Sequence, residues 1–207
     1  MSSRRLAVPP GRAGRLWLTR RLTVARRGAD LLDRKLQVLQ RELDQQRGAA
    51  ARAAAEWKHS QADAERWLLR AALLGGERAI RLAAAATFAE VTISHSATMG
   101  VRYPADATCI TPPPIGGDGP ALAAAREAHR AALAAAVQHA AAAEAFRVLE
   151  AETIATRYRL RAVRDRWIPR LEQALAEVTF ALEELERADA ARLRLAAAAR
   201  DRPSAAR

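Results

Sequence analysis

A stripe of apolar side chains, spaced alternately three and four residues apart, dominates the first half of the chain. It runs from Leu18 to Leu74 over eight heptads, and fifteen of its 17 positions are apolar. A period of 3.5 residues held over this length is the pattern of a coiled coil, because it keeps one face of a helix against a partner. Gly75 and Gly76 follow the stripe and are expected to bend or interrupt the helix. The stripe consists of Leu18, Leu22, Ala25, Ala29, Leu32, Leu36, Leu39, Leu43, Gln46, Ala50, Ala53, Trp57, Ser60, Ala64, Trp67, Ala71 and Leu74.

A second stripe runs from Phe146 to Leu195, on a helix that we expect to begin at Pro120. Its spacing is regular except at Trp167, which lies four residues from the stripe position on either side. Such an inserted step relaxes a left-handed supercoil. Pro169 also lacks the N–H that would bond the carbonyl of Asp165. Together these signals predict a bend or local unwinding, whose residues are Trp167, Pro169 and Leu171.

Residues 90–120 differ in composition, since Thr, Ser, Gly and Pro replace the charged residues. We interpret 91–94 and 101–103 as two short strands around a turn, followed by a loop. The hairpin residues are Met99, Gly100 and Val101. A two-stranded hairpin is marginally stable alone, so it must lean on the helices or on a partner.

These features predict an all-α fold: a long antiparallel two-helix coiled coil with a small β-hairpin inserted at the turn. The shaft comprises 12–89 and 121–195, the hairpin and loop 90–120, and the flexible ends 1–11 and 196–207. A turn centred near residue 105 would place Trp67 opposite 140–145 and Trp167 opposite Leu43. The termini would then meet at one end, with the hairpin at the other.

The net charge of +11 lies at the two ends of the chain. Residues 1–29 carry eight arginines and no acid, and 187–207 carry six arginines and two acids. Three interpretations remain open: a solvated, arginine-biased terminus, a nucleic-acid contact, or an electrostatic tip inserted into a protein partner. Nucleic acid is disfavoured because no recognisable reading motif is present. The candidate contact residues are Arg12, Arg15, Arg20, Arg21, Arg26, Arg27, Arg192 and Arg194.

No catalytic, cofactor or metal site is expected. The four histidines lack metal-ligand spacing, the Gly-Gly pairs lack the Gly-Lys-Ser/Thr of a phosphate loop, and the lone Cys109 has no obvious base. One cysteine cannot form an internal disulfide, which fits a reducing compartment. We also find neither an apolar run long enough to span a membrane nor a signal peptide, so a cytoplasmic location is expected.

Four segments, in chain order, resemble the D subunit of V-type and A-type rotary ATPases. Residues 25–35 (ARRGADLLDRK) are similar to the family's A-x-x-G-x-x-L-L-K-x-K, and 99–104 (MGVRYP) to its M-G-V-x-x-P. Residues 159–171 resemble R-V-N-A-L-E…I-P-x-L, and 185–194 resemble E-R-E-E-F-F-R-L-K. The chain departs from the family where N-A-L-E reads Arg161-Ala162-Val163-Arg164 and where F-F reads Ala190-Ala191.

The resemblance implies a non-catalytic central-stalk rotor subunit, peripheral to the plasma membrane. Its paired terminal helices would enter the catalytic hexamer and contact the catalytic and regulatory subunits. Its hairpin end would bind the small F subunit and the membrane-side socket subunit. Rotation would couple ion flow to ATP synthesis or hydrolysis, with no direct nucleic acid contact and no membrane insertion. The alternatives are a free-standing basic coiled-coil interaction protein and an architectural nucleic-acid-binding protein.

Overall fold

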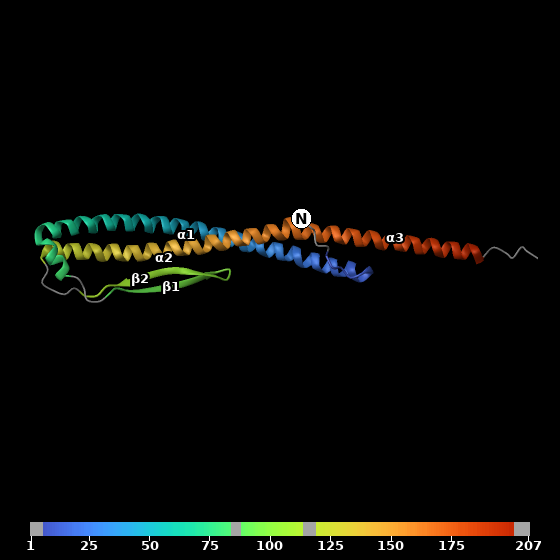
Figure 1. Cartoon of the computed structure of the whole chain (residues 1–207), viewed down its shortest axis with the longest axis horizontal. Coiled ribbons are helices and arrows are strands. Elements are labelled where there is room, and N and C mark those ends of the chain that lie inside the picture. Colours follow the sequence, from blue (N-terminus) through green and yellow to red (C-terminus); the bar gives the residue numbers. More distant parts are fainter. Residues whose placement is uncertain (1–5, 84–87, 114–118, 201–207) are drawn as a thin grey trace, which may run out of the picture. The chain divides into compact units, whose positions relative to one another are not determined.

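The computed structural model describes residues 6–83, 88–113 and 119–200 of the chain. Three helices, a π-helical segment and two strands follow one another in the order shown in Figure 1. The predicted fold class is confirmed, since two long helical segments enclose a small antiparallel hairpin. The elements are α1 (Gly11–Leu82), β1 (Glu90–Thr98), β2 (Val101–Ile110), α2 (Pro120–Arg161), η1 (Ala162–Trp167) and α3 (Ile168–Arg200).

The chain divides into two compact units. Met1–Arg34 and Arg157–Arg207 form what we call the terminal unit, in which the start of α1 pairs with η1 and α3. Lys35–Thr156 form the hairpin unit, which holds the rest of α1, both strands and most of α2. In the terminal unit a small core forms where Leu18 and Leu22 of α1 meet Leu171 of α3.

The first apolar stripe forms the seam in both units. All of its positions except Leu74 are buried or half-buried. Leu74 is exposed beside Gly76, whose φ of 71° and ψ of 165° interrupt the helix. The predicted interruption at these glycines is therefore confirmed, but the helix that follows ends at Leu82 and not at residue 89. This last piece has no buried side chain to hold it longer, and Phe88 is fully exposed.

The hairpin is longer than predicted, although its turn is where we expected it. Met99 (φ 52°) and Gly100 (φ 79°) both adopt left-handed conformations, as a two-residue type I′ turn requires. The register shifts between Ser94 and His95, which pair with Asp106 and Pro104. The strands were underestimated because β1 is exposed along almost its whole length and so shows no apolar alternation.

The hairpin packs against the helices of its own unit. Val101 and Tyr103 join a buried cluster with Leu39, Leu43, Ala145 and Leu149 of α1 and α2. The Tyr103 hydroxyl donates a 2.9 Å hydrogen bond to Glu42 Oε1. The strands consequently run back alongside α2 (Figure 1) and do not project beyond the helices. The prediction that the hairpin leans on the helices is confirmed.

The predicted helix register is also wrong. Trp57 stacks on His139 with ring centroids 5.2 Å apart, and Ala145 packs with Leu43, so 140–145 does not face Trp67. Trp167 lies near Arg21, whose guanidinium carbon is 5.7 Å from the ring centroid, and not opposite Leu43. The helices reverse between Gly76 and Pro120. The hairpin folds back inside this reversal, so the centre of the loop does not set the register.

A π-helical segment, η1, interrupts the second long helix just before Pro169. The N–H of Ile168 bonds the carbonyl of Val163, five residues earlier. Pro169 supplies no N–H to restore the ordinary spacing. The irregularity thus occupies Ala162–Trp167, while Leu171 is a fully buried residue of α3.

Candidate partner-binding surface at the paired helix ends

Three of the eight candidate arginines form ion pairs within the terminal unit. Arg12 lies 2.9 Å from Glu186 Oε1, and Arg26 lies 2.6 Å from Glu172 Oε1, so both join α1 to α3. Arg192 pairs with Asp189 of its own helix. Exposed pairs of this kind contribute at most about 1 kcal/mol each. Arg12 and Arg26 therefore hold the two helices together only weakly, and the charges of all three arginines are already partly neutralised.

Arg21 is held by aromatic rings. Its guanidinium carbon lies 4.9 Å from the ring centroid of Trp17 and 5.7 Å from that of Trp167. A guanidinium over the face of an indole is stabilised by the ring quadrupole. The cation is thus fixed in place and still faces solvent, because Arg21 remains exposed.

The other four candidates, Arg15, Arg20, Arg27 and Arg194, are exposed. Within the described ranges no ion pair or hydrogen bond engages their guanidinium groups. The sequence alone does not distinguish the eight arginines, because their charges are alike. Only the structure separates those that bind the chain itself from those available to a partner.

An open groove of about 510 Å³ lies between α1 and η1 on one side of the terminal seam. Its walls are mostly apolar, with arginine at the rim. Val24 is 67% exposed within it. The lining residues are Trp17, Arg20, Arg21, Val24, Ala25, Gly28, Leu32, Val163 and Trp167. We call this the Trp groove. Trp17 and Val24 were not predicted from the sequence, although each directly precedes a seam residue.

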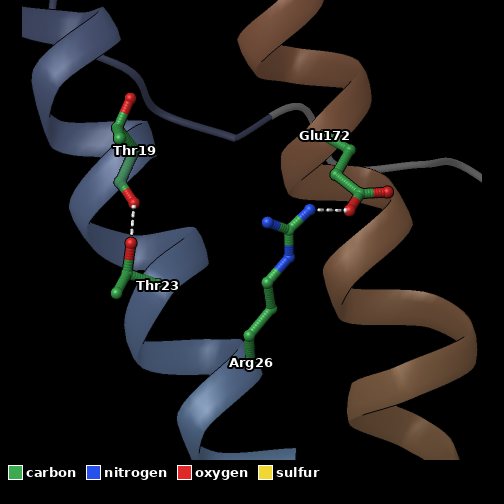
Figure 2. A network of polar contacts seen from close by, with 4 residues as sticks. All are labelled: Thr19, Thr23, Arg26 and Glu172. Atoms are coloured by element: carbon green, nitrogen blue, oxygen red, sulfur yellow. Dashed lines mark hydrogen bonds and ion pairs between the residues drawn. The ribbon is translucent and has the colours of Figure 1, made fainter.

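The other side of the same seam carries polar side chains beside apolar ones, and four of the polar ones are shown in Figure 2. Thr19 and Thr23 lie on α1, and each donates its hydroxyl to a backbone carbonyl four residues earlier, at 2.9 Å. Figure 2 shows the bond from Thr23 to the carbonyl of Thr19. Arg26 reaches across to Glu172 on α3. The groove on this side, about 660 Å³, has carboxylates and hydroxyls in its lining, which the Trp groove lacks. Its lining residues are Thr19, Leu22, Thr23, Arg26, Glu172, Leu175, Ala176, Thr179, Phe180 and Glu183. The two sides of the terminal unit therefore offer a partner different chemistry.

The predicted hairpin residues do not share one environment. Met99 is half exposed at the turn, next to Gly100. Val101 is only 9% exposed and belongs to the core of the hairpin unit. The structure thus leaves the turn residues available to a partner and uses Val101 for folding.

The described residues include no group of three or more His, Cys, Asp or Glu side chains that could hold a metal ion. Among the helices that the structure describes, none is long and apolar enough to cross a membrane. Cys109 is half-buried, and His139 lies against Trp57. These residues take part in packing.

A family model for the D subunit of ATP synthase matches residues 16–198, which is most of the chain. The match includes the seam of both units, the hairpin, η1 and nearly all of α3. No curated protein matches the chain. The family is that of a stalk subunit of rotary ATPases, which associates with the other subunits of a membrane-associated complex. The chain therefore belongs to the ATP synthase D-subunit family.

Proposed function

We propose that the chain is the central-stalk rotor subunit of a V/A-type rotary ATPase and transmits torque between the membrane ion-translocating rotor and the catalytic hexamer. The observation that carries this proposal is the pairing of the two chain ends in one unit. Leu18 and Leu171 meet in its core, both without solvent exposure. The ion pair between Arg12 and Glu186 joins the same two helices farther along.

Torque transmission requires that paired helices resist sliding past one another. In the terminal unit a slip of one turn would break the packing of Leu18, Leu22 and Ala25 against Leu171 and expose these side chains together. The subunit needs no catalytic group for this task, so we propose that it is a non-catalytic component. ATP chemistry would take place in the surrounding hexamer.

Asymmetry of the terminal unit would give the rotor its directionality. The segment η1 makes one helix irregular, and the two sides of the seam differ in chemistry. Such a shaft would press unequally on three catalytic sites and bias their open and closed populations. Pro169→Ala restores a backbone donor just after η1, where α3 begins. ATP-driven rotation and coupling of the assembled complex should change, whereas Pro104→Ala in the hairpin is the matched control. Unchanged rotation would sink the asymmetry argument.

The partners proposed on this basis are the catalytic and regulatory subunits of the hexamer at the terminal unit. The small F subunit and the membrane-side socket subunit would bind at the hairpin unit. The complex would lie at the cytoplasmic side of the plasma membrane, with this chain peripheral to it. Affinity purification tests the assignment, because a rotor subunit should recover these subunits in fixed ratio. Recovery of the chain alone, or of DNA that high salt removes, would favour the free-standing or the nucleic-acid-binding alternative.

A further inference from the structure

Residues near the N-terminus pack on the same side of the terminal seam as the Trp groove. Residues 6–10, here called the N-terminal strap, fold back over the start of α1. Leu6 and Val8 pack on the terminal core, and together with Ala174 and Val178 of α3 they line a depression of about 620 Å³. The strap passes so close to α1 that a Cβ at Gly14 would collide with the carbonyl oxygen of Pro9.

The strap and the Trp groove lie on the same side of the seam. On a helix, residues three or four apart share a face. Along α1 this relation links Gly14, under the strap, to groove residues at the same spacing: Trp17, Arg21, Val24 and Gly28. Along η1 and α3 it links the groove residues Val163 and Trp167 to residues that line the depression beside the strap: Arg170, Ala174 and Glu177. One channel therefore runs along the seam, with the strap in one section and open space in the next.

The two sections differ in charge. The strap section contains both Arg170 and Glu177, so its charges balance. The Trp groove has Arg20 and Arg21 at its rim, and no carboxylate belongs to its lining. Since Arg21 is held over two indole rings, it does not have to be ordered when a ligand binds. The section thus matches an apolar segment that brings its own carboxylates.

We propose that the Trp groove receives an apolar segment flanked by Asp or Glu from the inner surface of the catalytic hexamer. The apolar side chains would cover Val24 between the indoles of Trp17 and Trp167, much as Leu6 and Val8 cover the neighbouring section. The carboxylates would accept charge-assisted hydrogen bonds from Arg20 and Arg21. This inference rests on the proposed function and assigns two of its eight candidate arginines to one defined contact.

The first test measures the affinity of the full chain for the purified catalytic hexamer. Arg20→Gln with Arg21→Gln should weaken binding about tenfold or more, since charged hydrogen bonds are lost at a desolvated contact. The control, Arg34→Gln with Arg41→Gln, removes the same charge from exposed positions of α1 outside the groove. It should weaken binding by less than about threefold, the size of a screened long-range effect. Equal losses in the two variants would overturn the proposal.

A second variant tests the shape of the groove without changing charge. A Cβ at Gly28 meets no atom within 4 Å, so Gly28→Leu starts a side chain in open space beside the groove lining. It should block the hexamer about as strongly as the arginine variant while the melting temperature is kept or raised. Gly48→Leu is the matched helix control in the hairpin unit, and its binding should be unchanged. Normal binding by Gly28→Leu would overturn the proposal.

A photo-crosslinker at Val24 identifies the occupant in the assembled complex, with the neighbouring Thr23 on the opposite side as control. The Val24 adduct should map to a hexamer segment in which apolar residues adjoin Asp or Glu. An adduct on a segment without carboxylates would refute the assignment. If the unaltered chain does not bind the hexamer, the proposed function fails together with this inference. If it binds and the groove variants behave as their controls, the inference alone fails.

Discussion

Gly14 and Gly28 occupy the same helix face, yet alanine should affect them in opposite directions. Gly28 lies in the interior of α1, where alanine is more favourable than glycine by about 0.5–1 kcal/mol, and Gly14 lies in the first turn, where the gain is at most this large. At Gly28 a new Cβ has open space, so Gly28→Ala should gain this amount of stability. At Gly14 a new Cβ would collide with the backbone of Pro9, so Gly14→Ala must displace the N-terminal strap.

The loss at Gly14 follows from what the strap buries. Full burial of a Leu or Val side chain contributes about 1.5–3 kcal/mol, and Leu6 and Val8 are both half-buried. Their release therefore costs about 2–3 kcal/mol, and the backbone freedom regained by the strap offsets part of it. After the helix gain, Gly14→Ala should be less stable than the unaltered chain by about 1 kcal/mol. The two alanine variants should then differ by about 2 kcal/mol, or roughly 4–8 °C in melting temperature.

Thermal unfolding followed by circular dichroism measures this difference. Amide hydrogen exchange over residues 6–10 should accelerate in Gly14→Ala and stay unchanged in Gly28→Ala. A double-mutant cycle separates the strap from the helix: in a Leu6→Ala, Val8→Ala background, Gly14→Ala should become stabilising, because little strap packing remains to be lost. If it destabilises the two backgrounds equally, the collision with the strap is not the cause and the reasoning is refuted.

Three further changes test the hairpin unit. Leu149→Ala should lower the free energy of unfolding by about 2–5 kcal/mol, because this side chain has no solvent exposure. Denaturant titration measures the loss, and Leu133→Ala, at a half-exposed position, is the control. Tyr103→Phe removes the hydrogen bond to Glu42 and should cost about 1 kcal/mol, with faster amide exchange in β1 and β2; unchanged exchange would show that apolar packing alone holds the hairpin. His139→Phe removes a buried Nδ1 that has no partner among the described residues and keeps an aromatic ring for stacking, so melting should occur at the same or a higher temperature.

The seam was predictable because coiled-coil periodicity repeats over many turns. A stripe from Leu18 to Ala71 leaves one helix face to bury, and the structure buries or half-buries every position of it. Register was not predictable in the same way. Small alanines alternate with leucines along both helices, so several alignments satisfy the pattern. The loop length also gave a wrong register, because the strands between Gly76 and Pro120 fold back along the helices and do not extend the turn.

The candidate surface was predictable only in its location. The distribution of charge along the sequence shows that arginines gather at the chain ends. It does not show which guanidinium groups contact Glu186, Glu172 or an indole ring. Such pairings depend on the helix register, and because the register could not be predicted from the sequence, the pairings could not be predicted either. The π-helical segment was closer to prediction, because Pro169 and the four-residue spacing act locally and need no knowledge of the partner helix.

The register shift at Ser94 and His95 has a consequence for solubility. In a two-stranded sheet both strands are edge strands, and each offers unpaired backbone groups to which a second molecule could add a strand. In this ribbon the irregularity twists one strand away from flatness, and Pro104 on the other supplies no N–H at that point. If hairpins of separate molecules paired edge to edge, the ladder of hydrogen bonds between them would be interrupted at this point. The same irregularity thereby disfavours self-association of chains that have not yet assembled with other subunits.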